Sequence, residues 1–155
     1  MAEPSAHQEK VESWFPFLAG KVAAPRPRRL FAEPPEASFR AVFDGLLSLG
    51  FDRLCTITGC DDGETLSALY SLSHPDGTVF SLRRRVARER PLIGTVTDRF
   101  PGAANYEREL VDLLGFEVEG LPPGKRYPLP DSFPTDQKPL RKDWKPPAPP
   151  AASKP

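Results

Sequence analysis

The sequence predicts a small α+β domain, in which two main helices pack on an antiparallel meander and an extended C-terminal arm follows. Three strand-like runs lie close together at residues 53–58, 65–72 and 78–86, and connections this short make neighbouring strands antiparallel. Apolar residues at helical spacing flank these runs on both sides. One helical layer on one sheet can bury the apolar stripe of the first helix and one face of the sheet, but the second helix then needs a further explanation.

The composition is that of one globular domain. The chain has 155 residues, of which 39% are hydrophobic and 27% charged, and its formal net charge is +0. Balanced charge gives no electrostatic reason to expect nucleic acid or an anionic membrane as the main partner. No apolar run is long enough to cross a bilayer, and the polar N-terminus lacks the apolar stretch of a signal peptide. We therefore expect a cytosolic chain.

The distribution of prolines divides the chain. Of its 20 prolines, 11 follow Gly120, which predicts that the ordered domain ends near that residue. We therefore expect an N-terminal segment (1–25), an α+β domain (26–120), an extended partner-binding arm (121–145) and a disordered Pro/Ala-rich tail (146–155).

Three elements are predicted before the meander. Residues 7–19 have helical spacing, but Pro16 weakens this helix. Residues 26–31 are interpreted as a short edge strand, because edge strands tolerate proline and positive charge. Residues 36–49 form a clearer helix, with one apolar stripe and Gly50 at its end.

The last helix, residues 100–116, places a carboxylate among its apolar residues. On a wheel of about 100° per residue, Glu107 lies inside the apolar arc, where an unpaired carboxylate is unstable. Partial solvation near the helix N-terminus, a charge network inside the domain, or cations from a partner chain would each satisfy it. The arc is wider than one domain needs, which favours a partner. The predicted interface residues on this helix are Tyr106, Glu107, Arg108 and Glu109.

The segment KPLRKDW supplies the second half of the predicted interface. An arm without a core of its own needs a surface to lie on, either on this domain or on another chain. Tryptophan and arginine are favoured anchors in protein interfaces. The interface residues predicted here are Arg141, Lys142, Asp143 and Trp144.

The sequence offers little that would carry catalysis or hold a cofactor. Glu107 and Glu109 diverge on a helix and cannot flank one substrate bond. The sequence has no CxxC motif, and two isolated histidines, His7 and His74, do not predict a metal site. No glycine-rich phosphate loop is present. We therefore expect no catalytic residue, no cofactor and no metal ligand in this chain.

The basic run SLRRRVARER, residues 81–90, is the best candidate for nucleic-acid binding. Strand alternation would place Arg83 and Arg85 on one face and Arg84 on the other. The sheet lacks the paired exposed aromatic residues of an RNA-recognition motif. We therefore interpret the run as a strand edge that is protected by charge, with no nucleic-acid partner.

Two motifs resemble those of a known family. FPGAANYERELVDLLGF (100–116), followed by PLRKDW (139–144), is similar to the 30 kDa subunit family of respiratory complex I, the NADH:quinone oxidoreductase. The same family includes the equivalent small subunit of membrane-bound group 4 nickel–iron hydrogenases, to which the strand at 26–31 is closer. The resemblance covers about residues 26–144. One departure is Gly-Leu-Pro-Pro at 120–123, where the family often has Gly-His-Pro-Asp.

The resemblance implies a noncatalytic scaffold subunit in the peripheral arm of a membrane-bound redox complex, rather than an enzyme alone. It implies docking on the large catalytic subunit, of the complex I 49 kDa or nickel–iron hydrogenase type, beside iron–sulfur subunits. The location would be the cytoplasmic face of the membrane, touched only through the complex. The substitution Glu107→Gln would then weaken assembly. The alternative is a free-standing interaction module that acts through the arm and the proline-rich tail.

Overall fold

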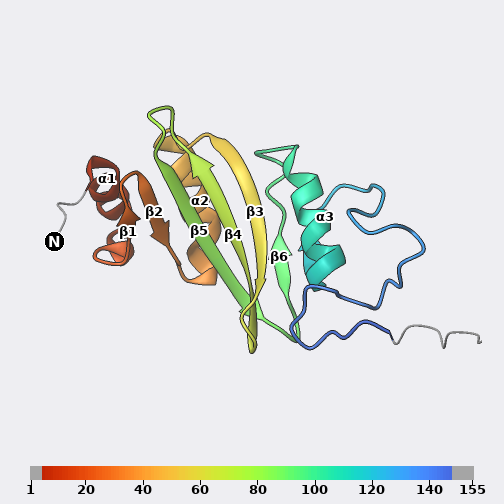
Figure 1. The fold of residues 1–155 in the computed structure, drawn as a ribbon. Helices are drawn as coiled ribbons and strands as arrows, with labels where there is room; N and C mark the ends of the chain where they lie inside the picture. The colour runs from red at the N-terminus through yellow and green to blue at the C-terminus, as the bar shows by residue number, and fades with distance from the viewer. Residues whose placement is uncertain (1–4, 148–155) are drawn as a thin grey trace, which may run out of the picture.

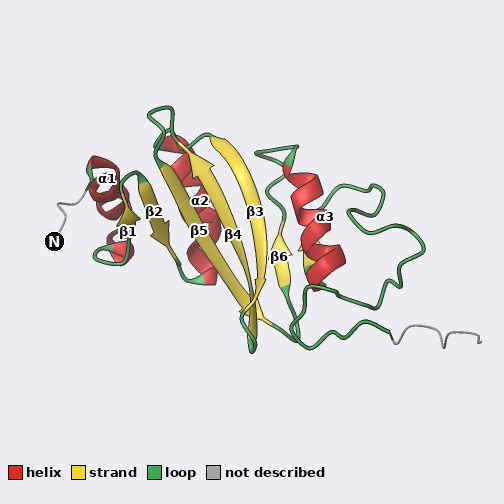
Figure 2. Cartoon of the chain, in the orientation of Figure 1, coloured by secondary structure: helices red, strands yellow, loops and turns green. Residues whose placement is uncertain are grey.

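A mixed five-stranded sheet forms the centre of the molecule, with its strands in the order β1-β2-β5-β4-β3. The computed structural model describes residues 5–147. Helix α2 covers one face of the sheet, while α1 and the C-terminal arm lie at opposite ends of the molecule (Figure 1). Figure 2 shows that the last part of the described chain is loop rather than helix or strand.

The predicted meander is confirmed. Strands β3 (Arg53–Asp61), β4 (Thr65–Ser73) and β5 (Val79–Ala87) pair in antiparallel fashion. Alternate residues of β4 are buried and face the helical layer, as expected for a sheet with one covered face. The α+β class that the sequence predicts is thus the class observed.

The predicted edge strand at residues 26–31 is instead a hairpin. Strands β1 (Ala23–Arg26) and β2 (Arg29–Ala32) pair in antiparallel fashion, and β2 also pairs in parallel with β5. The sheet is therefore mixed rather than wholly antiparallel. The proline is tolerated because Pro27 lies in the turn, beside Arg28 with a φ of 58°.

The main core lies between α2 (Phe39–Ser48) and the sheet. The rings of Phe39 and Phe43 lie 4.9 and 5.8 Å from the ring of Tyr70 on β4. Such aromatic contacts bury large apolar areas. A short 3-10 turn, η2 (Glu36–Ser38), precedes the helix.

The N-terminal segment contributes to the same core. Helix α1 (Ala6–Trp14) begins at Ser5, whose Oγ accepts a hydrogen bond from the backbone of Gln8. A 3-10 turn, η1 (Pro16–Leu18), follows at the proline that weakens the predicted helix. Val11 and Leu18 are fully or almost fully buried, so these residues pack with the domain.

Helix α3 (Ala103–Leu114) packs beside β3, and along the chain it connects the two strands of a small second sheet. These strands, β6 (Leu92–Gly94) and β7 (Glu117–Glu119), pair in parallel. The helix ends at Gly115, whose φ of 77° suits glycine.

The arginine-rich run lies on β5 and directly after it. Strand β2 pairs with β5 only over residues 79–82, so Arg83, Arg84 and Arg85 lie where that side of β5 has no strand partner, as predicted for a charged edge. Neighbouring side chains also compensate or cover these three arginines. Arg84 pairs with Glu36 and Arg85 with Glu33, while Arg83 lies over an aromatic ring of β2. The run therefore does not form an uncompensated basic surface.

None of the helices within residues 5–147 is long and apolar enough to cross a membrane. The predicted disordered tail, residues 146–155, lies outside the described residues from residue 148 onward.

Candidate functional site

Glu107 lies inside the domain and its carboxylate is satisfied there. The residue is 0% exposed. Its Oε1 accepts a hydrogen bond of 2.7 Å from the backbone N–H of Val96, and its Oε2 accepts one of 2.6 Å from the hydroxyl of Thr95. Burial nevertheless outweighs these two bonds and raises the pKa of Glu107. The carboxylate thus fixes the segment before α3 to the helix.

Arg108, which lies between Glu107 and Glu109 in the sequence, is engaged with neither of them. It donates to the side chain of Asn105 at 3.1 Å and to the carbonyl oxygens of Pro122 and Pro123 at 3.1 and 3.3 Å. It therefore ties α3 to the start of the arm. The structure does not place Glu107 on an accessible interface.

The other two predicted residues of α3 differ from each other. The hydroxyl of Tyr106 donates to the carbonyl of Cys55 on β3 at 3.2 Å, and its ring packs against the core. Glu109 is half-buried, and no side chain among residues 5–147 pairs with its carboxylate. Glu109 is thus the acidic residue of this helix that is available to a partner cation.

The arm caps the C-terminal end of α3. The Nζ of Lys138 donates to the carbonyl oxygen of Val111 at 3.1 Å. The backbone N–H of Leu140 donates to the carbonyl oxygen of Leu113 at 3.1 Å. The Nε of Arg141 donates to the carbonyl oxygen of Leu114 at 2.7 Å. The last carbonyls of a helix have no partner within the helix, and cations are favoured there. The first half of the KPLRKDW motif therefore stabilises this helix end.

The second half of the motif is fixed by Asp61, at the end of β3. Asp61 accepts from the backbone N–H of Lys142 at 2.8 Å and pairs with Arg88 at 2.5 Å. Arg88 also pairs with Asp143 at 2.6 Å. Burial alone would raise the pKa of Asp61, but Arg88 and the backbone donors from Lys142 and Gly63 lower it to about 2.

A third attachment of the arm starts from Asp112 on α3. Its carboxylate pairs with Arg126 at 2.5 Å and accepts from the backbone N–H of Leu129 at 2.9 Å. Asp112 is only 5% exposed, although the helical wheel places it outside the apolar arc. The arm therefore covers the side of the helix that carries Asp112, while Leu110 and Leu114 of the apolar arc pack on β3.

A surface hollow of about 560 Å³ remains between α3 and the first part of the arm. Four basic side chains line it, and the one acidic side chain, Asp112, is already paired. The basic residues are Arg108, Lys125, Arg126 and Lys138. The hollow is thus positively lined.

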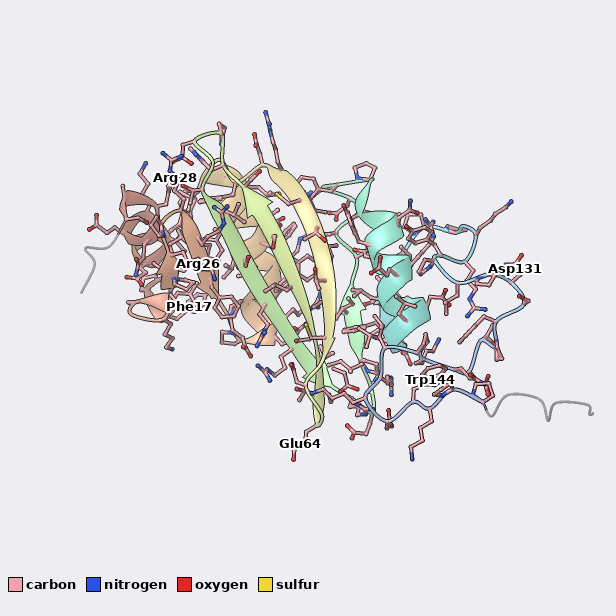
Figure 3. The ribbon with its side chains drawn as sticks, in the orientation of Figure 1. Phe17, Arg26, Arg28, Glu64, Asp131 and Trp144 are labelled. Carbon is pink, nitrogen blue, oxygen red and sulfur yellow. The ribbon has the colours of Figure 1, made fainter. Side chains whose placement is uncertain are left out.

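The outer side of the arm carries exposed apolar groups. Leu140 is 54% exposed and Tyr127 is 46% exposed. Trp144 is half-buried, and its Nε1 donates to Gln137 at 3.2 Å. Figure 3 shows Trp144 and Asp131 on the arm, far from Phe17 at the opposite end. The predicted interface residues 141–144 therefore brace the arm, and the side chains around them face outward.

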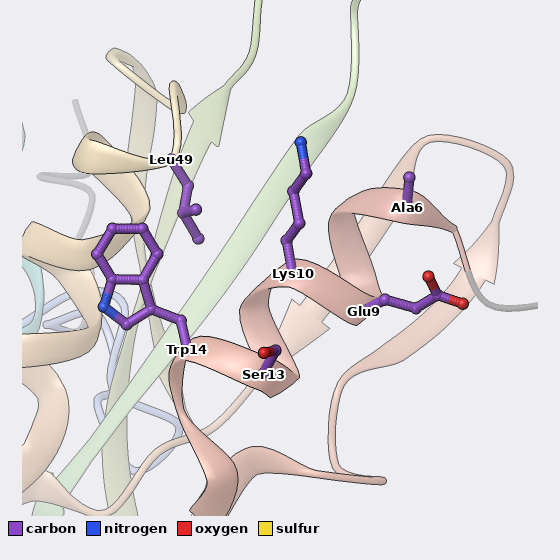
Figure 4. Close-up of a pocket in the computed structure, with 6 residues that line it drawn as sticks. All are labelled: Ala6, Glu9, Lys10, Ser13, Trp14 and Leu49. Carbon is purple, nitrogen blue, oxygen red and sulfur yellow. The ribbon is translucent and has the colours of Figure 1, made fainter.

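Two features lie at the far end of the molecule. Helix α1 borders a hollow of about 580 Å³ beside the exposed Trp14 and the partly buried Leu49 (Figure 4). The fold also brings together His7 and His74, with ring centroids 4.4 Å apart. The sequence-based view that these histidines are isolated is therefore wrong, because their contact depends on how α1 packs on the sheet.

The residues that sequence reasoning missed are those that receive the arm: Asp61, Arg88, Asp112 and Arg126. In the sequence Asp61 looks like a solvated charge in a turn, and Asp112 looks like one on the polar side of the last helix. No local pattern marks them, because each acquires its partner across 14 to 81 residues of chain.

The family model described as "Respiratory-chain NADH dehydrogenase, 30 Kd subunit" matches residues 34–150. A subunit of the F(420)H(2) dehydrogenase of Methanosarcina mazei is 32% identical over 88% of each chain. The NADH-quinone oxidoreductase subunit 5 of Thermus thermophilus is 34% identical over 71% of this chain and 58% of its own length. The formate hydrogenlyase subunit 5 of Escherichia coli is 41% identical, over 48% of this chain and 13% of its own length.

Solved structures share the fold. A chain of the archaeal membrane-bound sulfane sulfur reductase has a TM-score of 0.77 at 23% identity, over 88% of this chain and 82% of its own. A trypsin-resistant fragment of Nqo5 has a TM-score of 0.63 at 28% identity, over 74% of this chain and 98% of its own. From these matches and the motifs that form α3 and its cap, the chain belongs to the family of 30 kDa subunits of the respiratory-chain NADH dehydrogenase.

Proposed function

We propose that this chain is a noncatalytic scaffold subunit of a membrane-bound redox complex, and that it docks on the large catalytic subunit through the outer side of its arm. It supports electron transfer by holding neighbouring subunits in place and has no redox centre of its own. Its place in the cell is the cytoplasmic face of the membrane, which it contacts only through the complex.

The observation that carries the proposal is the attachment of the arm. Residues 121–147 form neither helix nor strand, yet they are held against the domain at Asp61, at Asp112 and at the end of α3. An irregular segment held this firmly, with Leu140 and Tyr127 exposed on it, is a preorganised surface. Preorganisation reduces the entropy that ordering costs when a partner binds.

The names of the relatives support the same role. They are subunits of an F(420)H(2) dehydrogenase, of NADH-quinone oxidoreductases and of a formate hydrogenlyase. A free-standing interaction module, the alternative from the sequence, is not favoured by these relatives. Whether the large subunit is of the hydrogenase or the complex I type is a question for the experiment that follows.

The test is purification from native membranes in mild detergent of three tagged forms of the chain: the wild type, Leu140→Asp and Phe17→Asp. Leu140 is 54% exposed on the arm and Phe17 is 42% exposed at the opposite end, so the second variant is a matched control. Circular dichroism checks that all three are folded. The co-purifying subunits are identified by mass spectrometry, and nickel is assayed.

We expect the wild type and Phe17→Asp to recover a large catalytic subunit, and Leu140→Asp to recover roughly tenfold less, as for a central interface residue. Nickel in the preparation identifies a hydrogenase type, and its absence together with NADH and quinone modules identifies a complex I type. Equal recovery by both variants would overturn docking through the arm. Recovery of the wild-type chain alone, where a control complex survives, would overturn the scaffold role.

A further inference from the structure

Two histidines and one aspartate converge where α1 meets the turn between β4 and β5. His7 Nε2 lies 2.7 Å from Asp76 Oδ2, and His74 Nδ1 lies 3.0 Å from Asp76 Oδ1. One possible ligand atom from each residue lies within 4.8 Å of the other two. His7 and Asp76 are 69 positions apart in the chain, so the fold creates this cluster, which we call the histidine cluster.

The packing around the histidine cluster orients its rings. Phe51 contacts both rings, at centroid distances of 5.3 Å from His7 and 5.4 Å from His74. His74 also lies where Gly50 has no side chain, since a Cβ there would come within 3.0 Å of its ring. The imidazoles are therefore held in place by core residues, as metal-binding histidines need to be.

The turn fixes the carboxylate in the same way. Asp76 Oδ1 accepts from the backbone N–H of Thr78 at 2.8 Å, and Thr78 is buried. The second oxygen stays directed at His7. The side chain of Asp76 is 45% exposed, against 17% and 25% for the two histidines, which leaves one side of the cluster open to water.

The ligand chemistry selects the class of ion. Two imidazole nitrogens with one carboxylate are the donors that zinc and similar divalent transition ions prefer, whereas calcium and magnesium prefer oxygen ligands. Zinc–ligand bonds are about 2.0–2.2 Å, so the ligand atoms of one ion lie within about 4.4 Å of one another. The three atoms of the cluster lie within 4.8 Å of one another, so small shifts bring them around an ion. Three protein ligands and an open side leave a fourth position for water.

We propose that His7 Nε2, His74 Nδ1 and the carboxylate of Asp76 form a binding site for one divalent transition ion of the zinc class, which fastens α1 to the sheet. The site lies at the opposite end of the molecule from the arm and does not depend on the proposed docking. Its role is structural, because it joins α1 to the turn between β4 and β5.

The test is titration of zinc into the full, untagged chain after chelator dialysis, followed by isothermal titration calorimetry. The variants are Asp76→Asn, in which the side-chain oxygen still accepts from Thr78, and His7→Gln. The control is Asp131→Asn, an exposed carboxylate on the arm (Figure 3). Long-range proton–nitrogen correlation spectra of the wild type report which imidazole nitrogens bind the ion.

We expect one zinc per chain, an affinity at least tenfold weaker in Asp76→Asn and in His7→Gln, and an unchanged affinity in Asp131→Asn. The nitrogen signals of His7 Nε2 and His74 Nδ1 shift on binding. Binding that survives both substitutions would place the ion elsewhere and overturn the proposal. A dissociation constant weaker than about 1 mM would overturn it as well, and the cluster would then be a hydrogen-bonded contact.

Discussion

Three carboxylates in the interior of this domain are stabilised in two different ways. Glu107 is bound by neutral donors, and its burial raises its pKa. Asp61 and Asp112 are each bound by an arginine and a backbone N–H. An arginine beside a carboxylate favours the charged form, whereas burial favours the neutral one. Glu107 and Asp61 therefore respond to pH in opposite ways.

Two substitutions of Glu107 separate the contribution of its hydrogen bond to Val96 from the contribution of its charge. Glu107→Ala leaves the N–H of Val96 buried and unpaired, so we expect the free energy of unfolding to fall by about 1–3 kcal/mol. Glu107→Gln keeps an acceptor for that N–H and carries no charge, so we expect it to stay within about 1 kcal/mol of the wild type. Urea denaturation at neutral pH measures both.

The pH dependence of Glu107→Gln is the control for this explanation. Because the folded pKa of Glu107 is raised above its ordinary 4.5, its contribution to stability is present below that pH and is lost as pH rises through the folded pKa. The stability of Glu107→Gln should not show this decline with rising pH, because the variant has no carboxylate to titrate. An equal loss of stability in the Ala and Gln variants would contradict the assigned hydrogen bonds.

The contribution of Asp61 to stability depends on pH in the opposite direction. Its pKa is lowered from 3.8 to about 2 in the folded chain, so its contribution is present above about pH 4 and is lost as pH falls towards 2. We expect Asp61→Asn to flatten the loss of stability in this range. Denaturation curves collected between pH 2 and 5 test this, and an unchanged slope would show that Arg88 and Lys142 do not stabilise the charged form.

At the scale of the element, α3 depends on close packing against β3. Gly59 on β3 faces Leu110 and Leu114, and a Cβ at Gly59 would lie only 2.3 Å from a methyl carbon of Leu114. Both leucines are 2% exposed, so neither has free space to move into. The helix can approach the sheet because this position has no side chain.

The substitution Gly59→Ala tests this packing. We expect it to lower the free energy of unfolding by about 1–3 kcal/mol, the usual cost of overpacking. Gly94→Ala is the matched control, because a Cβ there meets no atom within 4 Å and the residue also lies in a strand. Thermal unfolding of both variants measures the difference, and similar melting temperatures would contradict the close approach of α3.

The same element shows what could be predicted from the sequence. The 3.6-residue spacing of apolar residues and the glycine at its end predict α3 and its boundary, because these signals are local. The meander follows equally from alternation and short turns. The parallel pairing of β2 with β5 has no such signal, since it joins strands about 50 residues apart and depends on the whole topology.

The roles of the residues in α3 and the arm were less predictable from the sequence than the fold was. The motif around Arg141 marks the arm as significant, but residue type alone cannot distinguish a side chain that caps the chain's own helix from one that contacts a partner. Glu107 illustrates the same limit, because its donors come from Thr95 and Val96, which no helical wheel includes. Long-range contacts decide the role of each residue.

At the scale of the whole molecule, the arm is an extension of the domain rather than a free tail. Asp112→Ala removes the contacts to Arg126 and Leu129, so we expect the arm to open there and trypsin to cleave after Arg126 several times faster. Asp131→Ala, at an exposed position of the same arm, is the control. Time-resolved digestion with mass spectrometry measures the rates, and equal rates would contradict the attachment.

The contact between Asp61 and Lys142 also orders events during synthesis. These residues are 81 positions apart, so at about 5–20 residues per second the ribosome makes Lys142 roughly 4–16 s after Asp61. The meander and its core can pair before then, but the acid at the end of β3 and the carbonyls at the end of α3 wait for the final segment. A nascent chain that stalls before residue 138 would therefore carry a complete sheet, while the last carbonyls of α3 and the carboxylate of Asp61 would still lack their donors from the arm.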